Sequence, residues 1–469
     1  MKRPRSKAAL LLCLAAALVV GAAGCRRAPA RPNLVIVVLD TVRQDHTSSY
    51  GYSRDTTPRL RELAAESTLY QNAYSVSSWT VPAHASLFTG LFPATHQSNQ
   101  EHVRLAPGFT TLAELLAGAG YRTVAIVENP LISRANGFDQ GIEAFVGAWR
   151  TQSNVQPGGH DNTLDLVREA IDKLRGRPPF FLFLNLMEAH NPYDSSRQFR
   201  NTFVTDRSLE LTATSFQDFY LGRRSYSEAE LSHLRELYDA EILYDDWFVG
   251  ELMDALKAND LWNDTIFVVL SDHGENIGDH GHVDHVFTLY ETVTKIPLII
   301  HDPWHFTPGR VDEDPTQITD ILPTIANLLG IESTGVQGVD LLRPGARKGR
   351  SVICDYGWPV QVLRAFGDRR DDPALARWKR RLVSVTDGQS KLIWASDGKH
   401  ELYDLARDPA EERNLVGRPE RAAEVQRLTG LLERHYGGAL ESAAPGPAPA
   451  DESIDEQTRQ ELRSLGYVH

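Results

Sequence analysis

The stretch Asn33-Leu-Val-Ile-Val-Val-Leu39, which runs into Asp40, decides the fold of this chain. Its apolar, largely β-branched residues follow one another without a break over the length of one strand. Such a run is typical of a strand buried on both faces of a parallel sheet, because a solvent-exposed face would place a polar residue at every second position. We therefore predict a central strand over residues 33–39, with Asp40 at its carboxyl end.

Working outward, similar runs recur and alternate with segments of helical period. The predicted strands are 123–127, 180–186, 265–270 and 296–300, and the predicted helices are 59–66, 111–119, 162–174 and 228–256. Strands that alternate with helices indicate an α/β fold, here a doubly wound, mostly parallel sheet flanked by helices. We assign residues 33–345 to this domain.

The pattern changes after Gly345. Short runs at 350–354, 382–386, 391–395 and 401–403, separated by turn residues, predict an antiparallel sheet, and 418–435 predicts a helix packed on it. Residues 346–437 therefore form a smaller C-terminal α+β domain. The last segment, 438–469, is interpreted as an Ala/Pro-rich linker followed by a short helix at 453–465.

The first 25 residues have the composition of an export signal. Basic residues precede an apolar run over 8–23, which is too short to indicate a membrane span. Ala22-Ala23-Gly24-Cys25 resembles a bacterial lipoprotein cleavage box, and residues 26–32 would form a tether. We expect export to the bacterial cell envelope and membrane anchoring through lipidated Cys25; a plain signal peptide, leaving the protein periplasmic or secreted, is the alternative.

Composition and charge narrow the class of protein. The chain has 469 residues, 42% of them hydrophobic and 24% charged, as in globular proteins. Removing residues 1–24, which carry four basic and no acidic side chains, takes the formal charge from −13 to −17. An acidic chain without a basic run argues against nucleic acid as a partner. With Cys25 and Cys354 as the cysteines after cleavage, no disulfide framework is expected.

Polar residues follow three of the predicted strands. Asp40 ends the first, His190 lies in the loop after 180–186, and Asp272-His273 follows 265–270. Ligands of such sheets bind beyond the carboxyl ends of the strands. We predict that Asp40, Asp272 and His273, together with the oxygen of Thr80, hold a divalent metal ion that lowers the pKa of the Thr80 hydroxyl.

Thr80 lies in the segment 77–90, a turn followed by an apolar helical run. Pro82 fits the first turn of a helix, and Thr80 fits its capping position with an exposed side chain. The positive end of the helix would then face an anion. Taken alone the segment also fits an ordinary capped helix, and the strand-end residues are what favour a nucleophile.

Several histidines complete the predicted site. His84, one turn after Thr80, is placed to orient the nucleophile, and His190 to donate to an anionic oxygen or to a leaving group. His282 and His285 are the preferred substrate contacts of a histidine-rich segment. The acidic residues Asp239 and Asp245 are interpreted as helix-surface or capping residues outside the site.

Several motifs together resemble a known family. They are Pro32-Asn33-Leu34-Val35 leading to Asp40; Thr80-x-Pro82-x-His84 through Thr89-Gly90; the loop Met187 to Tyr193; Ser271-Asp272-His273-Gly274-Glu275; Leu289-Tyr290-Glu291 before Pro297-Leu298-Ile299; and Glu401-Leu402-Tyr403-Asp404-Leu405 with Asp408-Pro409 and Asn414-Leu415. The chain resembles a sulfatase-type member of the alkaline-phosphatase superfamily. Such enzymes cleave or transfer sulfate or phosphate esters through a covalent intermediate beside a divalent metal.

The resemblance implies roles position by position. Thr80 would be the nucleophile, Asp40, Asp272 and His273 would be metal ligands, and His190 and His285 would contact the ester. Sulfatases of this type carry Cys or Ser where this chain has Thr80, and that residue is oxidised to formylglycine. No formylglycine is expected here, because the β-carbon of threonine carries a methyl group.

Two further departures concern the metal. The family usually has paired acids where this chain has Asp40-Thr41, and Asn where it has His273. Losing a carboxylate and gaining an imidazole favours zinc or manganese over calcium, which prefers oxygen ligands.

The hypothesis is therefore a metal-dependent hydrolase or transferase that acts through Thr80, with phosphate esters preferred to sulfate esters. Its substrates would be small-molecule, glycan-linked or lipid-linked esters, and the oligomeric state is left open. A sulfuric ester hydrolase that uses unmodified Thr80 and a catalytically inactive binding protein are the alternatives.

Overall fold

The computed structural model describes residues 31–440, apart from 151–161, 178, 195–196, 208 and 210–216. The predicted signal peptide with Cys25, most of the predicted tether and the predicted helix at 453–465 lie outside the described residues. Among the helices in the described part of the chain, none has the length and apolar character needed to cross a bilayer.

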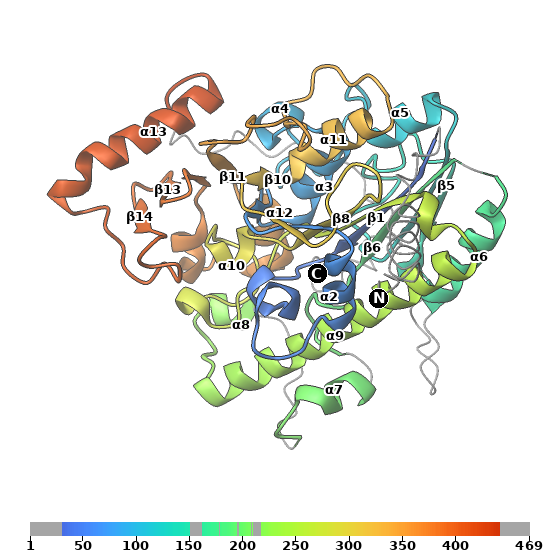
Figure 1. Cartoon of the computed structure of the whole chain (residues 1–469). Coiled ribbons are helices and arrows are strands. Elements are labelled where there is room, and N and C mark those ends of the chain that lie inside the picture. Colours follow the sequence, from blue (N-terminus) through green and yellow to red (C-terminus); the bar gives the residue numbers. More distant parts are fainter. Residues whose placement is uncertain are drawn as a thin grey trace, which may run out of the picture.

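An eight-stranded sheet forms the centre of the fold (Figure 1). Its order is β5-β4-β6-β1-β7-β8-β2-β9, with β1 (Asn33–Leu39) between β6 (Phe180–Leu186) and β7 (Thr265–Ser271). The other strands are β2 (Thr68–Tyr70), β4 (Arg122–Val127), β5 (Ala144–Gly147), β8 (Leu298–His301) and β9 (Arg310–Asp312). All neighbours pair in parallel except those of β8, so the predicted mostly parallel sheet is confirmed.

Strand β1 is buried on both faces, as its composition predicts. Val35, Val37 and Leu39 enter one apolar core, while the alternate residues Leu34, Ile36 and Val38 enter the other. One core is covered by α2 (Pro58–Ala65), α6 (Asn162–Leu174) and α9 (Glu228–Ala258), and the other by α3 (Thr80–Thr89), α5 (Leu112–Gly118) and α11 (Ile321–Leu328) (Figure 1). The two helical layers exclude water from both faces of the sheet.

The direction of β8 differs from that of its neighbours. It runs antiparallel to both β7 and β2, and it begins two residues later than the predicted strand. After β7 ends at Ser271, the chain stays at the carboxyl edge of the sheet and re-enters it from that edge, which reverses the strand. Residues 272–297 are thereby held where the parallel strands end.

A second sheet of four antiparallel strands follows, as predicted. Its strands are β11 (Val352–Tyr356), β12 (Leu382–Thr386), β13 (Ser390–Ala395) and β14 (Glu401–Asp404). Leu428 and Leu432 of α13 (Ala422–Tyr436) pack on its apolar face. The domain boundaries at 345 and 437 remain predictions.

The remaining elements are short. The helices are α4 (Pro93–His96), α7 (Arg197–Phe203), α8 (Gln217–Tyr220), α10 (Glu291–Thr294) and α12 (Val360–Ala365), and β3 (Ala73–Tyr74) pairs with β10 (Thr316–Gln317).

Candidate active site

Three central strands end in register at one edge of the sheet. Leu39 of β1 pairs with Leu186 of β6 and with Ser271 of β7. The residues that follow these strands therefore leave the sheet side by side. This places Asp40 and Asp272 next to each other, although they are far apart in the sequence.

Asp40, Asp272 and His273 form a buried cluster of potential metal ligands. One ligand atom from each lies within 4.8 Å of the others, and all three side chains are fully buried. The backbone amides of Thr41 and His273 donate to Oδ1 of Asp272 at 3.2 and 2.8 Å, and Nδ2 of Asn129 donates to Oδ2 of Asp40 at 2.7 Å. Within the described residues, the other two oxygens, Oδ1 of Asp40 and Oδ2 of Asp272, have no hydrogen-bond partner.

This donor set fits a divalent cation. Buried carboxylate oxygens without partners are unfavourable unless a cation or a donor meets them. The ring of His273 donates from Nδ1 to the carbonyl of Gly274 at 3.0 Å, which leaves the lone pair of Nε2 facing the cluster. Burial lowers the pKa of His273 to about 3, so the imidazole is neutral and can act as a ligand.

Thr80 lies against this cluster, but its place in the helix and the burial of its side chain differ from the prediction. Its Oγ1 is 3.4 Å from Nε2 of His273 and 3.5 Å from Nδ2 of Asn129. Thr80 is the first residue of α3, whose cap is the extended Trp79, so the predicted capping role is wrong. The prediction of an exposed side chain is also wrong, because α3 packs on the sheet and the strand-end residues cover Thr80 completely.

His84 contacts the backbone of Thr80. Its Nδ1 donates to the carbonyl oxygen of Thr80 at 2.9 Å and lies 3.7 Å from Oδ2 of Asp272. Burial lowers the pKa of His84, and the neutral ring is fully enclosed. His84 can therefore fix the first turn of α3, with its contact to the backbone and not to the hydroxyl of Thr80.

Two more of the predicted histidines adjoin the cluster. The ring centroid of His285 lies 4.5 Å from that of His273 and 5.2 Å from that of His190. Burial disfavours a charge on His285, but the carboxylates of Asp284 and Glu275 outweigh burial and raise its pKa well above the usual value. The ring of His285 therefore lies between those of His273 and His190, beside the Asp40 cluster.

His282 lies in a different environment from its predicted partner His285. Its ring packs against Trp378 and Tyr290, with centroid distances of 5.2 and 5.9 Å. Among the described residues, its ring contacts are with these aromatic side chains and not with the Asp40 cluster. The pairing of His282 with His285 at the reacting group is therefore not supported by their contacts.

Sequence reasoning missed two residues of the site. Asn129 lies two residues beyond β4 and touches both Asp40 and Thr80. The sequence could have indicated Asn129, because Glu128-Asn129 is one more polar pair after an apolar strand. Glu275 belongs to the motif Ser271-Asp272-His273-Gly274-Glu275 without a predicted role of its own, and it lies fully buried beside His285.

The prediction for Asp239, which lies outside the site, is wrong. The sequence predicts a helix-surface or capping residue, yet Asp239 is fully buried in α9. His46 and Arg54 meet its carboxylate at 2.7 and 2.6 Å. Asp245 is fully buried as well, because α9 packs between the core and the helices α2, α6 and α7.

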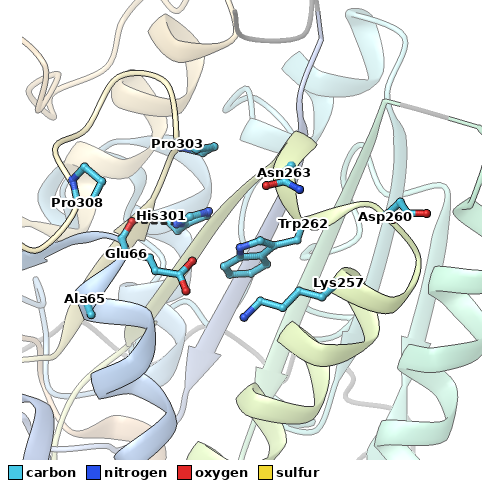
Figure 2. A pocket seen from close by; sticks show the side chains of 9 residues that line it. All are labelled: Ala65, Glu66, Lys257, Asp260, Trp262, Asn263, His301, Pro303 and Pro308. Carbon is cyan, nitrogen blue, oxygen red and sulfur yellow. Dashed lines mark hydrogen bonds between the residues drawn. The ribbon is translucent and has the colours of Figure 1, made fainter. Parts of the chain in front are cut away.

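A separate hollow lies at the opposite edge of the sheet (Figure 2). It has a volume of about 410 Å³ and is lined by Trp262, which precedes β7, and by His301, which ends the antiparallel β8. The Trp262 ring stacks on His301 at 4.4 Å, and Nζ of Lys257 lies 5.0 Å from its centre. The length of β7 separates this hollow from Asp272, so it is not part of the strand-end site.

Known proteins are similar to this chain in sequence and in fold. The sequence model of the sulfatase family matches residues 32–331. The arylsulfatase of Clostridium perfringens (strain 13 / Type A) is 22% identical over 480 residues, covering 89% of this chain and 96% of that protein.

Solved structures agree on the fold. The phosphonate monoester hydrolase of Agrobacterium radiobacter superposes with a TM-score of 0.68 at 21% identity, over 87% of this chain and 95% of its own. A protein solved in complex with its substrate D-glucosamine-2-N,6-O-disulfate gives a TM-score of 0.65 at 20% identity, over 87% and 98%. With the family match over most of the described chain, this protein belongs to the sulfatase family of the alkaline-phosphatase-like superfamily and is an ester hydrolase.

Proposed function

We propose that this protein is a metal-dependent phosphoester hydrolase that attacks its substrate with the unmodified hydroxyl of Thr80. The observation that carries the proposal is the position of Thr80 Oγ1, enclosed beside His273 Nε2 and the carboxylates of Asp40 and Asp272 at the start of α3. A divalent ion held by these residues would lower the pKa of the hydroxyl and act as a Lewis acid for an ester oxygen.

The residues around Thr80 support a nucleophilic role. Nδ2 of Asn129 points at Oγ1 as a donor and so favours the deprotonated oxygen. His84 holds the carbonyl of Thr80 and thereby the direction of its side chain. Oγ1 makes no contact shorter than 3.4 Å among the described hydrogen bonds, so its lone pairs are not tied up.

The reaction proceeds in two steps. In the first, the Thr80 oxygen bonds to phosphorus as the bond to the leaving oxygen breaks, and the leaving alcohol gains one proton for the one that the hydroxyl loses. Water then attacks the phosphoryl group, releases phosphate and restores the hydroxyl. His285, whose ring contacts those of His273 and His190, and His190 itself would contact the oxygens of the ester.

Two features of the site favour phosphate esters over sulfate esters: the Thr80 nucleophile and the composition of the metal ligands. Threonine cannot supply the aldehyde that formylglycine provides. The ligands Asp40, Asp272 and His273 mix carboxylate with imidazole, which favours zinc or manganese over calcium. A sulfuric ester hydrolase that uses the unmodified hydroxyl is the competing function, because the relatives include an arylsulfatase.

Purified protein assayed with matched aryl phosphate and aryl sulfate esters tests the proposal. Each ester is offered with zinc, manganese or calcium. We expect turnover of the phosphate with zinc or manganese and a loss of roughly 10³-fold or more in kcat/KM in Thr80→Ala. Thr89→Ala in the same helix, which removes a hydroxyl bonded to the carbonyl of Ala85, is the matched control and keeps its activity. Turnover of the sulfate alone with calcium, or full activity in Thr80→Ala, would overturn the proposal.

We further propose that the enzyme is exported and anchored to a bacterial envelope membrane through lipidated Cys25, and that its esters are small-molecule, glycan-linked or lipid-linked. Cys25→Ser should move the protein from the membrane fraction to the soluble fraction. Membrane retention of Cys25→Ser would contradict the anchor without touching the catalytic proposal.

A further inference from the structure

A second group of ligand-type side chains adjoins the first. Glu275, Asp284 and His285 each offer one ligand atom within 4.8 Å of the others. Nδ1 of His285 lies 2.9 Å from Oδ1 of Asp284 and 3.7 Å from Oε2 of Glu275. Ligand atoms about 2.0–2.2 Å from one ion are separated from each other by about this spacing.

Glu275 supplies an independent observation. Its side chain is fully buried, and within the described residues neither carboxylate oxygen has a hydrogen-bond partner of good geometry, with the neutral hydroxyl of Tyr193 and the ring of His285 as its polar neighbours. A buried carboxylate in this state is strongly unfavourable unless it meets a positive charge. His285, itself 2% exposed, likewise has ring nitrogens without a hydrogen-bond partner of good geometry in the described chain.

The charges of the group favour a dication. Two carboxylates face one imidazole, so a proton on His285 balances only one negative charge. A divalent ion balances both and leaves the imidazole neutral. The guanidinium of Arg43, which donates to the backbone carbonyl of Glu275 at 3.1 Å, is committed to Asp45 and Asp279 at 2.7 and 2.8 Å.

The loop that carries these residues is fixed in an unusual conformation. Asp284 has φ 69° and Phe287 has φ 65°, both in the left-handed region that such residues rarely adopt. Ile277 and Val283 form a bridge across the loop, and the hydroxyl of Tyr220 donates to the carbonyl of Val283. These contacts hold the carboxylate of Asp284 against His285.

We propose that Glu275, Asp284 and His285 bind a second divalent cation beside the one at Asp40, Asp272 and His273. The rings of His273 and His285 are 4.5 Å apart, so the two ligand sets form one continuous site. In two-metal hydrolases, ions about 3.5–4 Å apart clamp the attacking and leaving oxygens. The inference rests on the proposed phosphoester chemistry, in which His285 would reach the ester through this cation.

Zinc binding to chelator-stripped, full-length protein tests the inference. Calorimetric titration, followed by metal analysis after desalting, should give two equivalents per chain for the wild type. The isosteric variant Glu275→Gln should give one. Glu251→Gln, which neutralises a carboxylate on the outer side of α9, is the matched control and should keep two.

Manganese tests whether the two cations are neighbours. Electron paramagnetic resonance of the manganese-loaded wild type should show a spin-coupled pair, and Glu275→Gln should show isolated ions. Asp284→Asn provides a second variant, and circular dichroism verifies that each variant is folded.

One zinc in the wild type and the same count in Glu275→Gln would overturn the inference and identify the group as an imidazolium held between two carboxylates. The metal count does not depend on turnover. Two equivalents without phosphoester turnover would contradict the proposed function alone, whereas turnover with one equivalent would contradict this inference alone.

Discussion

Two buried clusters of charged side chains differ in whether the protein itself supplies a cation. In the first, Nζ of Lys391 on β13 meets Glu291 and Glu411 at 2.9 and 3.0 Å. The hydroxyl of Tyr74 donates to the remaining oxygen of Glu291 at 3.0 Å. The two carboxylates raise the pKa of Lys391 in spite of its burial, so the lysine stays charged between them, while burial raises the pKa of Glu411 to about 7.

In the second cluster, Asp40 and Asp272 face each other beside the neutral His273, and one oxygen of each is left without a partner in the described chain. No lysine or arginine of the described residues forms an ion pair with either carboxylate. The Lys391 cluster therefore joins β13 of the second sheet to α10, while the Asp40 cluster could hold a metal ion. A lysine of the chain between the carboxylates indicates a structural role for the first cluster, whereas among the described residues the second has no such lysine or arginine at the same depth.

Removing the cation of the paired cluster should have the largest effect on stability. We expect Lys391→Met to lower the free energy of unfolding by about 3–5 kcal/mol, because it leaves two buried carboxylates uncompensated. Lys399→Met removes the same charge from a side chain that is 73% exposed, and should change stability by less than about 0.5 kcal/mol. Urea denaturation followed by circular dichroism measures both. Equal effects of the two substitutions would remove the distinction between a paired core cluster and a surface pair.

Removing a metal ion from the second cluster should lower the stability of the folded protein, because a ligand that binds only the folded state stabilises it. Zinc at 100 times its dissociation constant should stabilise the folded protein by about 2.7 kcal/mol, and a chelator should abolish that gain. The measurement is the melting temperature with chelator, and again after zinc in excess is added back. An unchanged melting temperature in protein shown by metal analysis to have lost its zinc would contradict the assignment.

His96 sharpens the comparison with a buried histidine that the protein satisfies internally. Its Nε2 donates to Ser86 of α3, its Nδ1 accepts from the amide of Ser98, and burial lowers its pKa to about 3. Because the unfolded chain binds the proton near pH 6.5, stability should fall as the pH drops below that value. Between pH 7 and pH 5 this amounts to about 2 kcal/mol.

His96→Gln should flatten that part of the stability profile measured by urea denaturation at each pH. The exposed His102→Gln is the matched control and should follow the wild type. A His96→Gln profile with the full wild-type slope would show that another group carries the pH dependence.

The smallest expected effect concerns the residue that links Asp40 to Thr80. Asn129→Ala removes the donor to both, and we expect zinc affinity or ester turnover to fall by roughly 10-fold, as for other residues that orient metal ligands. Asn136→Ala, which removes a donor to the carbonyl of Leu131 in the same loop, is the control. Competition titration with a zinc indicator measures the change, and equal losses in both variants would indicate a general effect on the loop.

The apolar runs, which depend on local composition, predicted the strands well. The alternate residues of 33–39 had to be buried on both sides, and that forces a covered, mostly parallel sheet with Asp40 at its carboxyl edge. The family motifs then predicted that Thr80, Asp272 and His273 lie at the same edge. These features follow from sequence because strand period and strand ends are set within a few residues.

The sequence by itself therefore determined the sheet, its functional edge and the acidic and imidazole residues that follow its strands. Only the tertiary structure decided which side chains meet: it buried Thr80, brought Asn129 within reach of Thr80 and packed His282 against Trp378. The physical reason is that loop side chains point where left-handed residues such as Asp284 direct the backbone and where neighbouring elements leave space. Neither is encoded in the spacing of residues along the chain.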